Sequence, residues 1–510
     1  MKSNKKVLGI ALDSAEPNLI EKWTGEGCLP NLAAMRSKGT FGKLSSPAEW
    51  LAGSPWPTFY TGTLPGQHGF YHYLQWRGDK MQFERPGPEW IPVEPFWRRL
   101  GDNIRVVAVD IPLTYPPTPF NGIEISGWAS HDRIYPTSSF PKETIKWVIK
   151  EFGNPPIETE VGGLLDIGNL LAVRDELIRA NQKESELIAA LIKIETWDLF
   201  LCCFTSPHRA GHKFWDVTNV KGDMSESQRS QFGSALKDIY RSCDEAVGKI
   251  LNCIDDDTTV IIFSLHGMGS NPTLADELLA QMIFNILHGA HEATDGTNSN
   301  MITKIRNMIP LELRASIRKF LPFWLQDKMT AYWRHGGTDW SKTKVFKLLA
   351  DLQGYIRINL KGREKNGIVD IDEEYDELCD TLIQGIKSFK DEQSMEPLIE
   401  DINRSERLFY RGPGFNNLPD ILIKWKNRPA AEYTNIVSAE YGRLKWPIPG
   451  KNPDGRSGNH RPDGFLLALG EPFKINAAFD RQYHIIDLAP TILNLLKIEK
   501  PWEMEGTVIS

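Results

Sequence analysis

The residues best suited to chemistry in this sequence are four histidines that border apolar runs: His208, His212, His266 and His460. The first two stand four positions apart in SPHRAGHKFWD, and on a helix this spacing puts both imidazoles on one face, where they can share a metal ion. His266 directly follows the run TVIIFSL, and His460 lies in the polar segment SGNHRPDG. Taken alone, each histidine also suits a structural role.

A carboxylate and a hydroxyl complete the set of candidate groups. Asp13 ends the first apolar run, and four imidazoles with one carboxylate suit zinc or a similar divalent ion. Ser54, followed by Pro55, is predicted to cap the start of a helix. A hydroxyl there lies in positive potential beside unpaired backbone N–H groups, which suits an attacking alkoxide. A cap with no catalytic role is the simpler interpretation.

Short apolar runs bounded by turn residues must position these groups. They are residues 7–12, 106–111, 198–204, 259–265, 420–425 and 464–470. Between them, apolar residues recur at helical spacing in 174–194 and 232–251. This alternation predicts an α/β fold with a mostly parallel central sheet covered by helices on both faces. Such sheets bind ligands beyond the carboxyl ends of their strands, where Asp13, His208 and His266 fall.

Residues 272–340 differ from the rest, because their pattern is helical and places basic residues between apolar ones. We interpret them as a helical cap inserted into a catalytic core of residues 1–271 and 341–510. An amphipathic segment lying on a membrane surface is the alternative, which the small number of basic residues disfavours.

The composition limits the partners and the compartment. The 510 residues are 41% hydrophobic and 25% charged, as in soluble globular proteins, and the net charge of −7 gives no basic surface for a nucleic acid polymer. The six cysteines form no CxxC pair, which favours a reducing compartment. The N-terminal apolar stretch is too short for a signal peptide, and no stretch approaches about 18 apolar residues. We therefore expect a cytoplasmic protein without a membrane span, of unspecified oligomeric state.

Several motifs, in order along the chain, resemble those of one family. They are GIALDS, PNLAAMRSKGT, TFYTGTLPGQHGF, GHKFWD, FSLHGMG, NHRPDGFLLALG and DLAPTILNLLKI. Together they resemble the type I phosphodiesterase/nucleotide pyrophosphatase branch of the alkaline phosphatase superfamily, over most of the length of the chain.

The resemblance implies an alkaline phosphatase-like α/β fold with two divalent ions, usually zinc. One ion would be held by His208, His212 and His460. The other would be held by Asp13 and His266, with the nucleophile Ser54 attached. A small anionic phosphate ester or anhydride would be hydrolysed through a covalent intermediate on Ser54. Counting from the family's motif without a gap reaches Ala52, so the assignment of Ser54 requires a shift of two residues.

Two departures from the family pattern concern the metal ligands. His208 stands where the family has an aspartate before GH, and Leu265 stands where it has an aspartate before HG. Two divalent ions bring four positive charges, and among the expected ligands only Asp13 is an anion, so like-charge repulsion should weaken joint occupancy. We predict one firm metal site and a second that is weak or dependent on substrate. Three aspartates are candidates to supply the missing charge: Asp110, Asp132 and Asp463.

Other functions remain open for this fold. One alternative is a sulfatase, phosphonate hydrolase or phosphotransferase, although the segment SPWPT at 54–58 lacks the arginine expected of a sulfatase motif. The other is a degenerate member that binds an anion without turnover, and Leu265 is the residue that most favours it.

Overall fold

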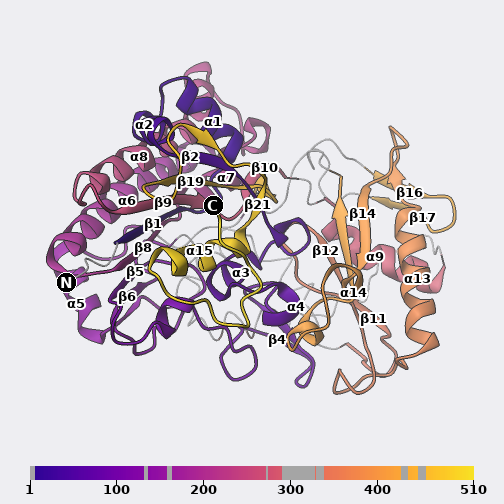
Figure 1. Ribbon diagram of the computed structural model, residues 1–510. Helices are drawn as coiled ribbons and strands as arrows, with labels where there is room; N and C mark the ends of the chain where they lie inside the picture. The colour runs from indigo at the N-terminus through magenta and orange to yellow at the C-terminus, as the bar shows by residue number, and fades with distance from the viewer. Residues whose placement is uncertain are drawn as a thin grey trace.

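The computed structural model describes residues 6–130, 136–157, 163–271, 274–289, 325, 328, 338–426, 435–445 and 455–510. Its largest feature is a ten-stranded sheet in the order β20-β2-β19-β9-β1-β8-β5-β6-β7, with β21 beside β2 (Figure 1). These strands are β1 Val7–Leu12, β2 Thr40–Ser45, β5 Val106–Val109, β6 Gly122–Ser126, β7 Ser138–Phe140, β8 Leu199–Phe204, β9 Thr259–Ser264, β19 Gly464–Leu469, β20 Ala477–Ala478 and β21 Tyr483–His484.

The centre of this sheet is parallel. Strand β1 pairs in parallel with β8 and β9, and β5 continues the parallel order through β8 and β6. Every residue of β1, β8 and β9 is buried, which explains why these strands read as unbroken apolar runs. The run at 464–470 forms β19, which lies antiparallel between β9 and β2. The predicted mostly parallel α/β sheet is thus confirmed, with antiparallel strands toward its edges.

Helices cover both faces because alternate strand residues point to opposite sides. Leu8 and Ile10 of β1 pack in one apolar cluster with the helices on the first face, while Val7 and Ala11 pack in another with those on the second. The first face carries α1 Pro17–Gly25, α2 Pro30–Lys38, α5 Lys142–Phe152, α6 Ile167–Ile194 and α8 Glu226–Leu251. The second carries α3 Pro55–Thr61, the 3-10 helix η2 Phe96–Arg99 and α15 Leu488–Leu495.

Short elements complete the part of the fold around the sheet. They are α4 Pro65–His68, α7 Ser206–Phe214, β3 Gln75–Arg77, β4 Gln82–Glu84, β10 Gly267–Ser270, β18 Gly458–Arg461, η1 Pro47–Glu49, η3 Val217–Asn219 and η6 Ile485–Asp487. Among the described residues, no helix is long and apolar enough to cross a membrane. All six cysteines are free thiols.

A second unit, coloured orange in Figure 1, has its own sheets and apolar core. Its strands are β11 Val345–Lys347, β12 Gly354–Ile358, β14 Ile399–Arg404 and β15 Ile421–Trp425 in one sheet, and β13 Lys390–Asp391, β16 Asn435–Ser438 and β17 Gly442–Lys445 in another. Its helices are α9 Leu274–His288, α13 Glu373–Lys387, α14 Ser405–Leu408 and the 3-10 helix η4 Phe415–Asn417.

The second unit contains segments from both predicted parts of the chain, the core and the cap. The apolar run at 420–425 forms β15 of the second unit, although we predicted residues 341–510 as part of the core. Helix α9, from the predicted cap, packs against β11, β12 and α13 because its apolar side chains join the same cluster. Residues 290–324 and 329–337 of the predicted cap lie outside the described residues.

Candidate metal-binding site

Two elements that meet at the carboxyl end of the parallel strands carry three of the predicted histidines. Helix α7 begins at Ser206, directly after β8, and presents His208 and His212. Strand β18 pairs antiparallel with β10 and carries His460 opposite Met268. The two elements approach so closely that a Cβ on Gly458 would lie 2.2 Å from the carbonyl oxygen of Gly211, so this position requires glycine.

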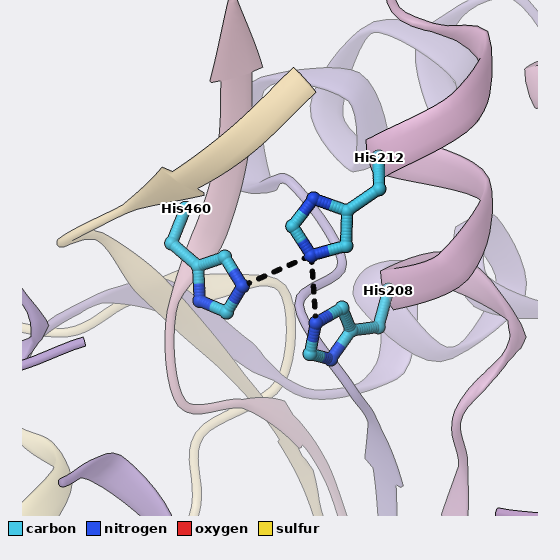
Figure 2. A group of neighbouring side chains, drawn as sticks. All are labelled: His208, His212 and His460. Atoms are coloured by element: carbon cyan, nitrogen blue, oxygen red, sulfur yellow. Dashed lines mark hydrogen bonds between the residues drawn. The ribbon is translucent and has the colours of Figure 1, made fainter. Parts of the chain in front are cut away.

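The side chains of His208, His212 and His460, which we call the histidine trio, point toward one another (Figure 2). Nε2 of His212 lies 3.0 Å from Nε2 of His208 and 3.3 Å from Nε2 of His460. Zinc–imidazole bonds of about 2.0–2.1 Å at tetrahedral angles separate two ligand nitrogens by about 3.3–3.4 Å. Two separations in the trio are close to this value and all three ligand atoms lie within 4.8 Å of one another, so the trio fits one tetrahedral ion with a fourth position left for water or substrate.

The hydrogen bonds of Nδ1 of His208 and His212, the two histidines on α7, define which tautomers are present. Nδ1 of His208 lies 2.8 Å from Oδ2 of Asp13, and Nδ1 of His212 lies 2.8 Å from the carbonyl oxygen of Gly458. Because a carboxylate and a carbonyl only accept hydrogen bonds, both Nδ1 atoms carry the proton. In the neutral form, each ring turns its Nε2 lone pair toward the other. Such outer partners are typical of histidines that bind metals.

A cation resolves the repulsion that this arrangement would otherwise create. A proton on one Nε2 would satisfy a single pair, because Nε2 of His212 has one lone pair and faces two neighbours. A metal ion accepts a lone pair from all three nitrogens at once. The donor set of the trio thus fits a divalent ion better than it fits a chain of hydrogen bonds.

His460 is held in the neutral form that metal binding needs. Burial lowers the pKa of His460 well below its ordinary value, and the neighbouring imidazoles and Arg456 lower it further. Its Nδ1 is buried and has no hydrogen-bond partner among the described residues. Unlike the two rings on α7, this ring is oriented by packing, because the ring of His266 stacks on it at 4.5 Å and an interplanar angle of 18°.

The residues predicted to hold a second ion are brought near the trio but not into an equivalent cluster. Asp13 uses one carboxylate oxygen for His208 and accepts a hydrogen bond from Nε1 of Trp56 (3.1 Å) with the other. His266 lines the same pocket. Within the described residues, the histidine trio is the group of three or more side chains that could share one ion. The roles of Asp13 and His266 as metal ligands stay predictions.

Of the three aspartates named as candidates, neither of the two that the structure describes takes the place that Leu265 leaves without a charge. Leu265 is buried in an apolar cluster with Phe263. Asp110 accepts hydrogen bonds from the backbone N–H groups of Trp128 and Ala129, and burial raises its pKa to about 6. Neither Asp110 nor Asp463 lines the pocket. The third candidate, Asp132, lies outside the described residues.

Ser54 is the residue before α3, as predicted, but its side chain makes no capping hydrogen bond and does not line the pocket. Its Oγ is fully buried and donates a hydrogen bond to the carbonyl oxygen of Leu51 at 2.7 Å. The pocket wall here is formed by Ala52, Gly53 and Pro55. For Ser54 to attack a bound substrate, its side chain would have to break this hydrogen bond and rotate, so its role as nucleophile stays a prediction.

Sequence reasoning missed two charged residues of the pocket. Arg456 and Asp351 both line it, and Nη1 of Arg456 lies 3.2 Å from Oδ1 of Asp351. The signal for Arg456 was its place four residues before His460. Asp351 had no such signal, because it comes from the second unit and lies far from every motif. The rest of the wall is mainly apolar and aromatic: Trp56, Tyr73, Ile111, Leu113 and Tyr115.

The fold is that of the alkaline phosphatase-like enzymes. At 10% identity, the chain is similar to the structure of phosphonoacetate hydrolase from Sinorhizobium meliloti in complex with phosphonoacetate, with a TM-score of 0.52 over 97% of this chain and 95% of that one. It is also similar, at 13% identity, to an inactive variant of murine ectonucleotide pyrophosphatase/phosphodiesterase 5 in complex with AMP, with a TM-score of 0.48 over 98% of this chain and 96% of that one. No curated protein sequence matches the chain.

The family is defined by sequence as well as by fold. The profile of the type I phosphodiesterase / nucleotide pyrophosphatase family matches residues 7–428, and the chain belongs to this family. The family expected from the motifs is confirmed and is one of phosphoric ester hydrolases. The alkaline phosphatase-like fold is confirmed as well.

Proposed function

We propose that this chain hydrolyses small anionic phosphate esters or anhydrides, and that its activity depends on one divalent ion, zinc by the nature of its ligands. The observation that carries the proposal is the convergence of three imidazole Nε2 atoms, spaced for a tetrahedral ion, in a member of a phosphoric ester hydrolase family. Three neutral nitrogen ligands with an open fourth position are typical of catalytic rather than structural zinc sites.

When bound, such an ion would polarise a phosphoryl oxygen and lower the pKa of water at the open position. The chain's own residues contribute orientation. The carboxylate of Asp13 holds the ring of His208, and the carbonyl of Gly458 holds the ring of His212. His266 and Arg456 face the same pocket, and a phosphate group beside the trio would lie among these groups.

The apolar part of the pocket supports an ester with an aromatic or apolar leaving group. The rings of Trp56, Tyr73 and Tyr115 and the side chains of Ile111 and Leu113 form this wall. Such a wall excludes water and offers flat surfaces to a ring. The net charge of −7 disfavours a nucleic acid polymer, so we propose a small-molecule substrate.

For the attacking group, the resemblance and the geometry point in different directions. The resemblance implies a covalent intermediate on Ser54, whereas the hydroxyl of Ser54 is buried against the carbonyl of Leu51. The geometry favours attack by water. The variant Ser54→Ala separates the two routes, because loss of the nucleophile would lower kcat at least about 1,000-fold, while loss of a buried hydrogen bond would not.

The function as a whole is tested by elemental analysis and by turnover of a nitrophenyl panel of phosphate diester, phosphate monoester, phosphonate and sulfate. We expect one zinc per chain and turnover of a phosphate ester that is lost on chelation and regained with zinc. Preferential turnover of the sulfate or the phosphonate would favour those alternatives. Bound zinc without turnover of any ester would contradict the proposal and favour the anion-binding alternative.

A further inference from the structure

The pocket contains one fixed positive charge that is not part of the metal-binding trio. The guanidinium of Arg456 and the carboxylate of Asp351 form an ion pair in the wall, with side chains 26% and 24% exposed. Both charges of this pair are about three-quarters buried and lose hydration on folding, so the pair is weak evidence for a contribution to stability. Folding stability alone therefore gives little reason for a charged pair at this place.

The backbones of both residues are fixed to the strand that carries His460. Asn459, which is fully buried, donates from Nδ2 to the carbonyl oxygen of Asp351 at 2.9 Å and to Oδ1 of Asn271 at 3.2 Å. Asn271 in turn donates to the carbonyl oxygen of Arg456 at 2.9 Å. These two buried amides make Arg456 and Asp351 part of the same rigid framework as the histidine trio.

The charges that line the pocket indicate which ligand charge it complements. Among the residues that the structure describes, the charged side chains that line it are Asp13, Asp351 and Arg456, whose charges sum to −1. One divalent ion changes this sum to +1, and without Arg456 the sum with the ion would be 0. A guanidinium binds phosphate oxygens through paired N–H groups, and its charge does not titrate. The pocket with one ion and Arg456 therefore complements a monoanion.

We propose that Arg456, positioned by Asp351, is the cation that binds the substrate anion in this pocket. It supplies positive charge in place of a second metal ion, and this suits the site to monoanionic phosphate diesters. Leu265 leaves the second ion without a carboxylate ligand, and Arg456 then supplies the positive charge that this ion would have brought. The inference concerns binding, and it rests on the proposed function only in taking a phosphate ester anion as the ligand.

The test uses the full-length protein loaded with one equivalent of zinc, and it measures binding of diphenyl phosphate, a monoanion, by calorimetry. Arg456→Gln is expected to weaken this binding about 10- to 100-fold, the effect of one charge-assisted contact, while zinc stoichiometry stays at one. The matched control is Arg443→Gln, which removes a guanidinium paired with Glu392 on the second unit. Equal affinity in Arg456→Gln and wild type would overturn the inference, as would two zinc ions per chain in the wild type.

A second variant tests the charge rather than the contact. Asp351→Asn raises the sum of charges with one ion from +1 to +2, so binding of phenyl phosphate, a dianion, should improve relative to diphenyl phosphate by at least about threefold. Glu392→Gln is the control, and circular dichroism checks the fold of each variant. An unchanged ratio of the two affinities would overturn the charge argument.

The binding test also separates this inference from the proposed function. Binding that depends on Arg456 in a protein that hydrolyses no ester would leave the inference standing and remove the proposed hydrolysis. Hydrolysis and ligand binding that are unchanged in Arg456→Gln would leave the proposed function standing and remove the inference about Arg456.

Discussion

The two halves of the predicted two-ion centre differ in how completely their groups are supported. In the histidine trio, the two rings on α7 have an outer hydrogen-bond partner and the third is fixed by stacking. In the other half, Asp13 turns its carboxylate to His208 and Trp56, and the position of the expected second carboxylate is the buried Leu265. The comparison teaches that Asp13, which we predicted as a ligand of the second ion, orients a histidine of the first site in this structure.

The largest effect is expected from removing a ligand of the trio. His212→Ala should reduce zinc content from about one equivalent to near zero and lower the rate of ester hydrolysis at least about 1,000-fold. Elemental analysis and the nitrophenyl assay measure both. His288→Ala, which removes an exposed imidazole at the end of α9, is the control and should change neither. Full zinc content in His212→Ala would show that the histidine trio is not the zinc site and would contradict the comparison between the two halves.

The second half can be restored in part by Leu265→Asp. In the absence of metal, a buried carboxylate among apolar neighbours should lower the free energy of unfolding by about 3–5 kcal/mol. Added zinc should recover part of this loss and raise the stoichiometry toward two. The neutral variant Leu265→Asn is the matched control, because it should lose stability without gaining a second ion. A stoichiometry that stays at one in Leu265→Asp would count against the charge argument.

A smaller effect is expected when the outer partner of the trio is changed. Asp13→Asn keeps the size of the side chain but removes the anion that fixes the tautomer of His208, so zinc should bind about 10- to 100-fold more weakly. Competition with a chelator measures this affinity. Asp255→Asn, at an exposed ion pair with Lys6, is the control. If Asp13 instead ligates a second ion, the variant will lose that ion and keep the first at full affinity.

The smallest effect on metal is expected from Asp110→Asn, since Asp110 lies outside the pocket; asparagine also tolerates its φ of 53°. Burial raises the pKa of Asp110 from 3.8 to about 6. An acid with a raised folded pKa stabilises the fold below pH about 3.8, and this stabilisation, up to about 3 kcal/mol, is lost as pH rises through about 6. Denaturation at pH 4 to 7 should show a smaller fall in stability in the variant, while zinc content stays unchanged.

The strands at the centre of the sheet could be predicted from the sequence because they are buried. Strand β1 matches its predicted range of 7–12, and β8 and β9 differ from theirs by one residue, since buried parallel strands are continuous apolar runs. The run at 420–425 has the same local pattern but forms β15 in another sheet. Local periodicity defines a strand without defining its neighbours, so the boundary of the second unit was not predictable in this way.

The candidate site could also be predicted in part from the sequence. The i, i+4 spacing on α7 and the strand-end positions located the histidines, and the resemblance grouped His460 with them. Whether Asp13 binds a metal or a histidine depends on the orientation of its carboxylate, which is set by tertiary contacts with Trp56 and His208. Asp351 enters the pocket from the second unit, and no local pattern marks such a residue.

The order in which the trio is supplied along the chain has a consequence for biosynthesis. His460 follows His212 by 248 residues, and β19, which comes after it, must insert between β9 and the early strand β2. During translation, the ribosome would therefore release both rings of α7 long before their third partner exists. A prematurely terminated chain that ends before β18 would lack β19 of the central sheet and His460 of the proposed zinc site, so zinc uptake would distinguish finished molecules from fragments.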